Sequence, residues 1–331
     1  MSCDVRYDSA WRVGSVRGVV DAVTGDSDKG AVMPSKVEPL EHQESHYRNA
    51  IWWLASYPKS GSTWVRLFVN CAITKFPVNL NTPFQYVLGD LSAAMYQSVS
   101  GVPLGLMGTR EIVYLRPAAL INRLAQHPQR DVCLKTHNAN MAIDDVPLCP
   151  ERITRAALYI VRDPRDVVIS WAKHLGLSID ETITIMADES SNIRHEGVPM
   201  SHFVSSWSRH VKSWLSNQNG MDVVCVRYED MLATPVATFS TVVEALGLQD
   251  IIDDGAFQFA LEQTEFSNLK QLEQQDGFRE RGINQGTFFN RGVSGGWRDV
   301  LTTDQARRIE DDHGEMMEVL DYELEQACSV V

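Results

Sequence analysis

One stretch of the sequence, IWWLASYPKSGSTWVRLF at residues 51–68, constrains the fold more than any other. Its apolar start at 51–55 is typical of a buried strand, and its end continues as a helix that we expect to stop by Pro77. The loop between them contains Lys59 and Gly61. Strand, glycine-containing loop and helix in this order point free backbone N–H groups at an anion. The stretch therefore predicts a site for a phosphate-like group.

Apolar strands alternate with helices along the rest of the chain. Further strands are predicted at 131–136, 156–161 and 222–226, and helices at 116–126, 165–175, 180–189, 201–217, 234–246 and 302–320. This alternation predicts an α/β fold whose central, mostly parallel sheet is flanked by helices on both faces. Ligands in such folds bind at the carboxyl ends of strands, where the motifs below are expected to lie.

The first 48 residues differ in composition from the rest of the chain. Residues 1–48 are rich in Asp, Gly, Ser, Val and Glu without a sustained period, which predicts a poorly ordered N-terminal extension. Residues 49–331 contain no linker or repeat and are predicted to form one domain. A net charge of −13 argues against general nucleic-acid binding, so an anionic ligand needs a local basic pocket.

Targeting and metal signals are also absent from the sequence. No apolar run reaches membrane-spanning length, and no N-terminal segment joins a basic start to an apolar stretch. We therefore expect a cytoplasmic protein without a membrane span. The cysteines and histidines show no metal-ligand spacing, and we expect no metal.

The loop at 57–64 reads YPKSGSTW. It is not the P-loop of NTPases, because Lys59 precedes Gly61 instead of following it. It resembles the P-loop-like 5′-phosphosulfate loop, Y-P-K-S-G-[ST]-T-W, of the sulfotransferases that use 3′-phosphoadenosine 5′-phosphosulfate (PAPS). The resemblance implies PAPS as co-substrate. The residues that would bind its phosphosulfate and adenine are Lys59, Ser60, Gly61, Ser62, Thr63 and, by stacking on the adenine, Trp64.

A second segment, YIVRDPRDVVISW at 159–171, combines a strand end, a turn and a helix start. It resembles the family's 3′-phosphate segment, V-R-[DN]-P-[RK]-D-x-x-x-S, which implies that Arg162 and Ser170 hold the 3′-phosphate. Arginine suits this task because its planar fork binds phosphate with two parallel hydrogen bonds. The alternative is a solvated turn with internal ion pairs, which fits Arg165 and Asp166 better than Arg162.

A third segment, NRGVSGGWR at 290–298, resembles the family's R-K-G-x-x-G-D-W-K loop, which closes over the cofactor. Arg291 and Gly292 occupy the positions of its lysine and first glycine. Asn290 and Gly296 depart from the pattern, and the first departure removes one cation from the 3′-phosphate site.

Two shorter segments resemble the family's adenine contacts. VRYED at 226–230 places Tyr228 where the family's tyrosine hydrogen-bonds the adenine. TEF at 264–266 places Thr264 and Phe266 where a threonine and a phenylalanine contact the same ring.

The segment Lys135-Thr136-His137 follows a predicted strand and resembles the family's K-T-H, whose histidine is the general base. The resemblance implies transfer of a sulfuryl group from PAPS to a hydroxyl or amine of a small-molecule acceptor. His137 would take the acceptor proton, and Lys59 would stabilise the leaving phosphate. Lys135 would orient the sulfuryl oxygens, and no Mg²⁺ is needed.

Other functions fit parts of the sequence. A P-loop-like nucleotide kinase would require the missing G-K-[ST]. A non-catalytic module that binds the 3′,5′-bisphosphate product would need neither Lys59 nor His137. The acceptor is not indicated by the sequence. A homodimer stays open, because the family's K-x-x-x-T-V-x-x-x-E segment is only faintly echoed from Arg298 onward.

Overall fold

The computed structural model describes residues 49–82, 84–194, 200–216, 220–278, 280–281, 286–289 and 292–325. The predicted N-terminal extension at 1–48 lies outside these residues, as do Asn290 and Arg291 of the third segment.

Five parallel strands form the central sheet, in the order β2-β3-β1-β6-β9. Their bounds are Val87–Gly89 (β2), Val132–Thr136 (β3), Ile51–Ser56 (β1), Thr154–Val161 (β6) and Val223–Arg227 (β9). β1, β3, β6 and β9 are the predicted strands, with ends that differ by no more than two residues. β2 was not predicted, because three residues are too few to show a period.

Eleven helices are found in the described part of the chain. They are α1 Ser62–Thr74, α2 Ala93–Ser100, α3 Thr109–Ala125, α4 Pro164–Leu175, α5 Ile179–Ala187, α6 Trp207–Leu215, α7 Tyr228–Ala233, α8 Pro235–Ala245, α9 Asp254–Gln263, α10 Phe266–Asp276 and α11 Thr303–Val319. Short 3₁₀ helices lie at Leu104–Leu106, Glu151–Ile153 and Gly296–Asp299, and two small hairpins pair β4 (Ala142–Ile143) with β5 (Val146–Pro147) and β7 (Asn192–Arg194) with β8 (Ser201–Phe203).

Two predicted helix starts are wrong. The helix expected over 201–217 begins at Trp207, because Ser206 caps it by accepting a hydrogen bond from the Arg209 backbone N–H. The helix expected from residue 116 begins at Thr109 and contains Pro117. Proline disfavours the helical conformation of the residue before it, so the predicted start stood next to this proline and not at Thr109.

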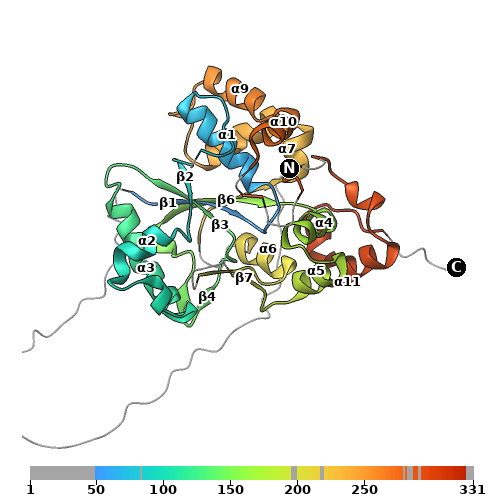
Figure 1. Ribbon diagram of the computed structural model, residues 1–331, viewed down its shortest axis with the longest axis horizontal. Helices are drawn as coiled ribbons and strands as arrows, with labels where there is room; N and C mark the ends of the chain where they lie inside the picture. Colours follow the sequence, from blue (N-terminus) through green and yellow to red (C-terminus); the bar gives the residue numbers. More distant parts are fainter. Residues whose placement is uncertain are drawn as a thin grey trace, which may run out of the picture. The chain divides into compact units, whose positions relative to one another are not determined.

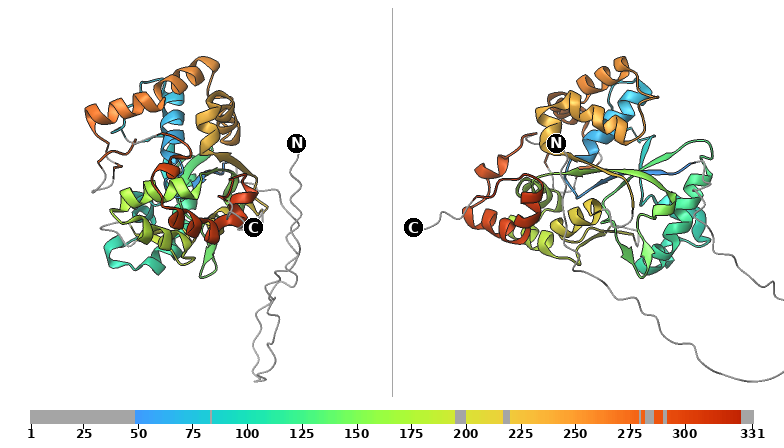
Figure 2. Two further views of the ribbon diagram at one scale, coloured as in Figure 1. Left: turned by 90° about the vertical axis from the view of Figure 1, so that its right-hand side faces the viewer. Right: turned by 180° about the vertical axis from the view of Figure 1, so that it is seen from behind.

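Helices cover both faces of the sheet, as Figures 1 and 2 show, and each face has a hydrophobic core. Side chains alternate along β1, so Trp53 and Ala55 enter one core while Leu54 enters the other. Helices α3, α4, α6 and α11 pack in the first core and α1, α8 and α9 in the second. This arrangement confirms the predicted fold class, with a parallel sheet covered on both faces.

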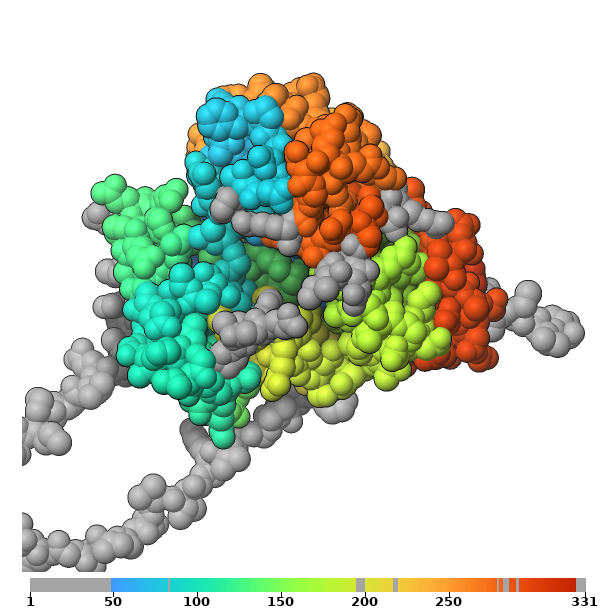
Figure 3. All heavy atoms as spheres, in the orientation of Figure 1, coloured from blue at the N-terminus to red at the C-terminus, as the bar shows by residue number. Residues whose placement is uncertain are grey.

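Because all five strands are parallel, their carboxyl ends meet at one edge of the sheet. The register places Ala55 opposite Thr136, Ser56 opposite Ile160, and Val161 opposite Arg227. The motifs that follow these strands are thereby brought together from distant parts of the sequence. In the space-filling view the molecule is hollowed between the segments around this edge (Figure 3). Within the described residues, no helix combines the length and apolarity needed to cross a membrane.

Candidate active site

A cavity of about 360 Å³ is lined by residues from these strand ends and from the segments that follow them. Twelve of the residues predicted for the site line it: Lys59, Gly61, Ser62, Thr63, Trp64, Lys135, His137, Arg162, Ser170, Tyr228, Phe266 and Gly292. Arg291 lies outside the described residues. Six separate motifs therefore meet around one space.

Two predicted residues are not among those that line the cavity. Ser60 is fully buried, and its hydroxyl has no hydrogen-bond partner among the described residues. Thr264 is buried after α9, where its hydroxyl donates to the backbone oxygen of Ala260 at 2.7 Å. The structure thus gives the Thr264 side chain a role in ending a helix.

The loop between β1 and α1 turns through two residues with positive φ. Lys59 has φ 66°, and Gly61 has φ 110° at the start of α1. A Cβ on Gly61 would lie 2.7 Å from Cδ2 of Tyr228, so only glycine fits here without a shift. The side chain of Lys59 extends until its Nζ lies 4.1 Å from the centroid of the Phe288 ring.

The two lysines in the cavity have lowered pKa values. Burial, together with the nearby charge of Arg162, lowers the pKa of Lys59 to about 8. Burial, together with the charge of Arg66, lowers the pKa of Lys135 to about 7. The positive groups in this cavity favour binding of an anion. The negative charge of the anion would raise the pKa values of both lysines toward their ordinary values.

Arg66 and Glu280 form an ion pair that also lines the cavity, and sequence reasoning missed both. Nη1 of Arg66 lies 3.0 and 3.2 Å from the two carboxylate oxygens of Glu280. The pair joins α1 to a residue 214 positions later. The charge of Glu280 raises the pKa of both Lys59 and Lys135, which favours their charged forms.

Arg162 lies between three motifs. Its guanidinium carbon is 4.2 Å from the centroid of the Tyr228 ring, and its Nη atoms lie 3.3 Å from the Lys59 oxygen and 3.4 Å from the Val293 oxygen. Both hydrogen bonds are long, and Nε is buried without a partner among the described residues. Arg162 therefore retains donors for a ligand anion.

Arg165 and Asp166 have structural partners. Arg165 forms ion pairs with Asp163 at 2.8 Å and Glu310 at 2.6 Å, and its guanidinium carbon lies 4.1 Å from the Trp297 ring centroid. Asp166 accepts hydrogen bonds from the backbone N–H groups of Gly295 (2.8 Å) and Trp297 (2.9 Å). The third segment is thereby bonded to the start of α4.

Gly292, in the same segment, approaches the adenine-contact segment closely. It has φ 61°, and a Cβ there would lie 2.4 Å from Cγ of Phe266. A larger residue would push the third segment away from the cavity.

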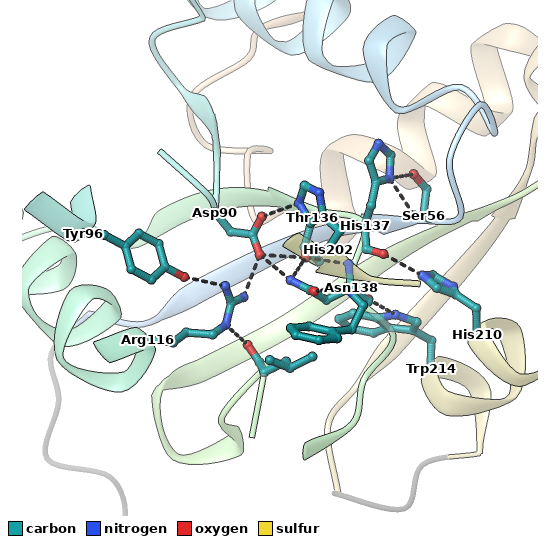
Figure 4. A network of polar contacts seen from close by, with 12 residues as sticks. Ser56, Asp90, Tyr96, Arg116, Thr136, His137, Asn138, His202, His210 and Trp214 are labelled. Atoms are coloured by element: carbon teal, nitrogen blue, oxygen red, sulfur yellow. Dashed lines mark hydrogen bonds and ion pairs between the residues drawn. The ribbon is translucent and has the colours of Figure 1, made fainter. Parts of the chain in front are cut away.

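His137 follows β3, and its ring lies beside Ser56 (Figure 4). Nδ1 lies 2.8 Å from the backbone oxygen of Ser56. A carbonyl oxygen only accepts, so Nδ1 carries the proton and Nε2 of the neutral ring carries the lone pair. Burial, with the charge of Lys135, lowers the pKa of His137 well below its ordinary value. The ring is therefore a neutral base at physiological pH.

A buried polar network surrounds the backbone of His137, and sequence reasoning missed it (Figure 4). Its centre is Asp90, which forms a 2.6 Å ion pair with Arg116. Burial would raise the pKa of Asp90, but Arg116 and His202 outweigh it and hold that pKa well below its usual range. Gly89-Asp90 lies in a segment where the sequence shows no period, so no local signal could have identified it. Among the described residues, no group of His, Cys, Asp and Glu side chains is arranged to hold a metal ion.

The fold and the cavity define an α/β protein with a cationic, nucleotide-sized site and a neutral histidine base. The chain belongs to the sulfotransferase family, since the family model described as "Sulfotransferase domain" matches residues 51–321. The predicted family, and with it the class of transferase, is confirmed.

Among curated relatives, cytosolic sulfotransferase 13 of Arabidopsis thaliana is 23% identical over 285 residues, which cover 84% of this chain and 80% of that protein. Flavonol 4′-sulfotransferase of Flaveria chlorifolia is 21% identical and covers 78% and 76% respectively. A mouse sulfotransferase solved in complex with PAP aligns with a TM-score of 0.51 at 18% identity, over 82% of this chain and 85% of that one. The structural likeness establishes the shared fold.

Proposed function

We propose that this protein transfers a sulfuryl group from PAPS to a hydroxyl or amine of a small-molecule acceptor. The observation that carries the proposal is that His137, with its lone pair fixed on Nε2, lines the same cavity as Lys59 and Arg162. The cavity thus combines a proton acceptor with two groups that bind anions. The names of the sulfotransferases above, and the PAP in the mouse structure, support the same reaction.

The residues present fit the adenosine 3′,5′-bisphosphate part of PAPS. Arg162 has a buried Nε without a partner among the described residues and two long hydrogen bonds, so it can turn its donors to the 3′-phosphate beside Ser170. Tyr228 and Phe266 supply ring edges and faces for the adenine, and Trp64 lies next to Tyr228.

At the other end of the site, Lys59 and the first residues of α1 would hold the 5′-phosphosulfate. No side chain caps α1, so its first backbone N–H groups at Ser62 and Thr63 are available to an anion. The pKa of Lys59, at about 8, keeps its side chain mostly charged near neutral pH. PAPS, when bound, would supply the sulfuryl group. The negative charge that is left when its S–O bond breaks would stay on its 5′-phosphate.

The chain's own residues provide the acid–base chemistry. His137 Nε2 takes the acceptor proton, while the Ser56 carbonyl keeps the proton on Nδ1 and stabilises the ring as it becomes charged. Lys59 stabilises the negative charge that grows on the leaving phosphate. Lys135 lies near the end of β3, two residues before His137, and would orient the sulfuryl oxygens.

We also propose that the protein acts in the cytosol and that its acceptor is a small molecule. The relative named as a cytosolic sulfotransferase supports the location, and the relative named as a flavonol sulfotransferase supports the acceptor class. The predictions of a homodimer and of no role in nucleic-acid binding stay predictions. The nucleotide-kinase and bisphosphate-sensor alternatives are not favoured, because the family match covers the whole of residues 51–321.

The proposal is tested by incubating the purified protein with sulfur-labelled PAPS and a panel of phenols, alcohols and amines. We expect label in at least one acceptor and release of PAP in equal amount. His137→Ala should lower turnover about 10²–10⁴-fold while the affinity for PAP stays near that of the wild type. PAP binding without label transfer to any acceptor, or full turnover by His137→Ala, would contradict the proposed reaction or the proposed base.

A further inference from the structure

We propose that Asp90 is a positioning residue for His137, which it holds through the residues on either side. The inference rests on the proposed function, because it assigns a task to the base of that reaction. Asp90 is not among the residues that line the cavity, so it would act through His137 and not on the acceptor.

The contacts on both sides of His137 lead to the same carboxylate oxygen. Thr136 Oγ1 donates to Oδ2 of Asp90 at 2.7 Å, and Asn138 Nδ2 donates to the same oxygen at 3.0 Å. Thr136 and Asn138 are both buried. One oxygen atom therefore fixes the chain immediately before and immediately after the base (Figure 4).

Asp90 is itself held rigidly. Its side chain is fully buried and forms the ion pair with Arg116, which is 2% exposed. Arg116 donates in turn to the backbone oxygen of Leu148 (2.6 Å) and to the hydroxyl of Tyr96 (2.9 Å). The other carboxylate oxygen lies 3.1 Å from Nε2 of His202, whose ring lines the cavity. Asp90 thus connects β3 to α2, α3 and β8.

The remaining freedom of His137 is removed from the opposite side. His210 Nε2 lies 3.2 Å from the backbone oxygen of His137, and Ser56 accepts from the ring Nδ1. With the flanking residues bonded to Asp90, both the backbone and the ring of His137 are restrained. Nε2 is the ring atom that this arrangement leaves for chemistry.

The energetics favour a positioning role over a purely stabilising one. A buried ion pair contributes little net stability compared with apolar residues of the same volume, because both charges lose their hydration. Proton transfer, by contrast, requires heavy atoms within about 2.6–3.2 Å, and a misplacement of about 1 Å can cost roughly 10²-fold in rate. A fully bonded network beside the base meets that requirement.

Removing Asp90 itself would leave Arg116 buried without its partner, so the test instead removes the Thr136 hydroxyl, which donates to Asp90 (2.7 Å) and accepts from the backbone N–H (3.0 Å) and Nδ2 (3.1 Å) of Asn138. Thr136→Val keeps the shape of the side chain and removes the hydroxyl that reaches Asp90. Thr136→Ser is the matched control, because it keeps that hydroxyl. We expect Thr136→Val to lower kcat about 10–100-fold, with the affinity for PAP unchanged, and Thr136→Ser to stay within about twofold of the wild type.

A second readout does not depend on the acceptor. Protein with ¹⁵N-labelled histidine reports the tautomer of each ring by long-range ¹H–¹⁵N spectra, and His137→Gln identifies the His137 signals. In the wild type and in Thr136→Ser we expect the Nδ1–H tautomer for His137. In Thr136→Val we expect its signals to shift and broaden, since the ring is less restrained. A purely structural role would lower the melting temperature alone.

The two hypotheses fail separately. Unchanged kcat and an unchanged His137 spectrum in Thr136→Val would overturn the positioning role, even if His137→Ala abolishes turnover. Equal losses in Thr136→Val and Thr136→Ser would overturn it too. If the wild type transfers no sulfuryl group, the proposed function fails, whereas the spectra still decide whether the contact to Asp90 restrains His137.

Discussion

Gly61 and Tyr228, which both line the cavity, are in contact with each other. A Cβ on Gly61 would lie 2.7 Å from Cδ2 of the tyrosine ring. The loop between β1 and α1 therefore packs against the start of α7, which follows β9, and leaves no space for a side chain at residue 61. Glycine is therefore needed here for two reasons: its φ of 110° and its contact with Tyr228.

We expect Gly61→Ala to weaken PAP binding about 5- to 150-fold, because the loop must move away from Tyr228 and adopt a strained backbone, at a cost of about 1–3 kcal/mol. Calorimetric titration with PAP measures the effect. Gly101→Ala is the matched control, since Gly101 also has a positive φ (67°) but has no neighbouring atom within 4 Å of a Cβ. Equal loss of PAP affinity in both variants would show that the Tyr228 contact is irrelevant.

The affinity for PAP should fall as the pH rises from about 7 to 8.5. Burial lowers the pKa of Lys135 to about 7 and that of Lys59 to about 8, so both lysines lose their positive charge in this range. The bound anion favours the charged forms, so PAP binding should take up protons. Titrations in buffers of different ionisation enthalpy measure this uptake. In Lys59→Ala the step near pH 8 should disappear, and its persistence would assign the step to another group.

The pKa of His137 is lowered well below its ordinary value, so His137 stays neutral down to a pH well under 6.5. The pH profile of kcat/KM should accordingly lack a fall caused by this histidine between pH 6 and 7.

Arg162→Ala should weaken binding of PAP but hardly change binding of a 5′-nucleotide that lacks the 3′-phosphate. The expected loss is roughly 1.5–3 kcal/mol, the value of a hydrogen bond to a charged group. Parallel titrations with PAP and with 5′-AMP measure the difference. Arg165→Ala, which removes the ion pairs to Asp163 and Glu310, should lower stability without this nucleotide preference. Equal losses for both nucleotides in Arg162→Ala would indicate a structural role.

Asp90→Asn should lower the free energy of unfolding by about 3–5 kcal/mol, because it leaves Arg116 charged and buried without its counter-ion. Urea unfolding followed by tryptophan fluorescence measures the change. Combining it with Arg116→Met removes both charges and should restore part of the loss. A single variant as stable as the wild type would show that the pair is hydrated.

The sequence was sufficient where the signal is local. A strand, a loop and a helix start lie within about 18 residues at 51–68, so chemistry and fold could be predicted together there. The four longer strands of the sheet were found in the same way, from runs of apolar residues, whereas the site residues that follow them were identified by their resemblance to the family's motifs.

What could not be predicted depends on contacts between distant residues. Asp90 meets Thr136 over 46 positions and Arg66 meets Glu280 over 214, and neither aspartate nor glutamate stands in a recognisable pattern. Thr264 shows the reverse case, since a matching motif is present while its hydroxyl donates to the backbone of its own helix, and its contact with the adenine stays a prediction. Motif matching identifies residue types, whereas the direction of a side chain is decided by packing.

The bridging position of Arg162 has a consequence for how the chain matures. Its guanidinium joins the oxygen of Lys59 to that of Val293, two residues from opposite ends of the described domain. During synthesis the nucleotide pocket is therefore incomplete until residue 293 has left the ribosome. A ligand that binds only the completed pocket stabilises the native state by RT ln(1 + L/Kd), where L is the free ligand concentration. Under the proposed function, PAP and PAPS would therefore protect finished chains from degradation while leaving truncated chains exposed.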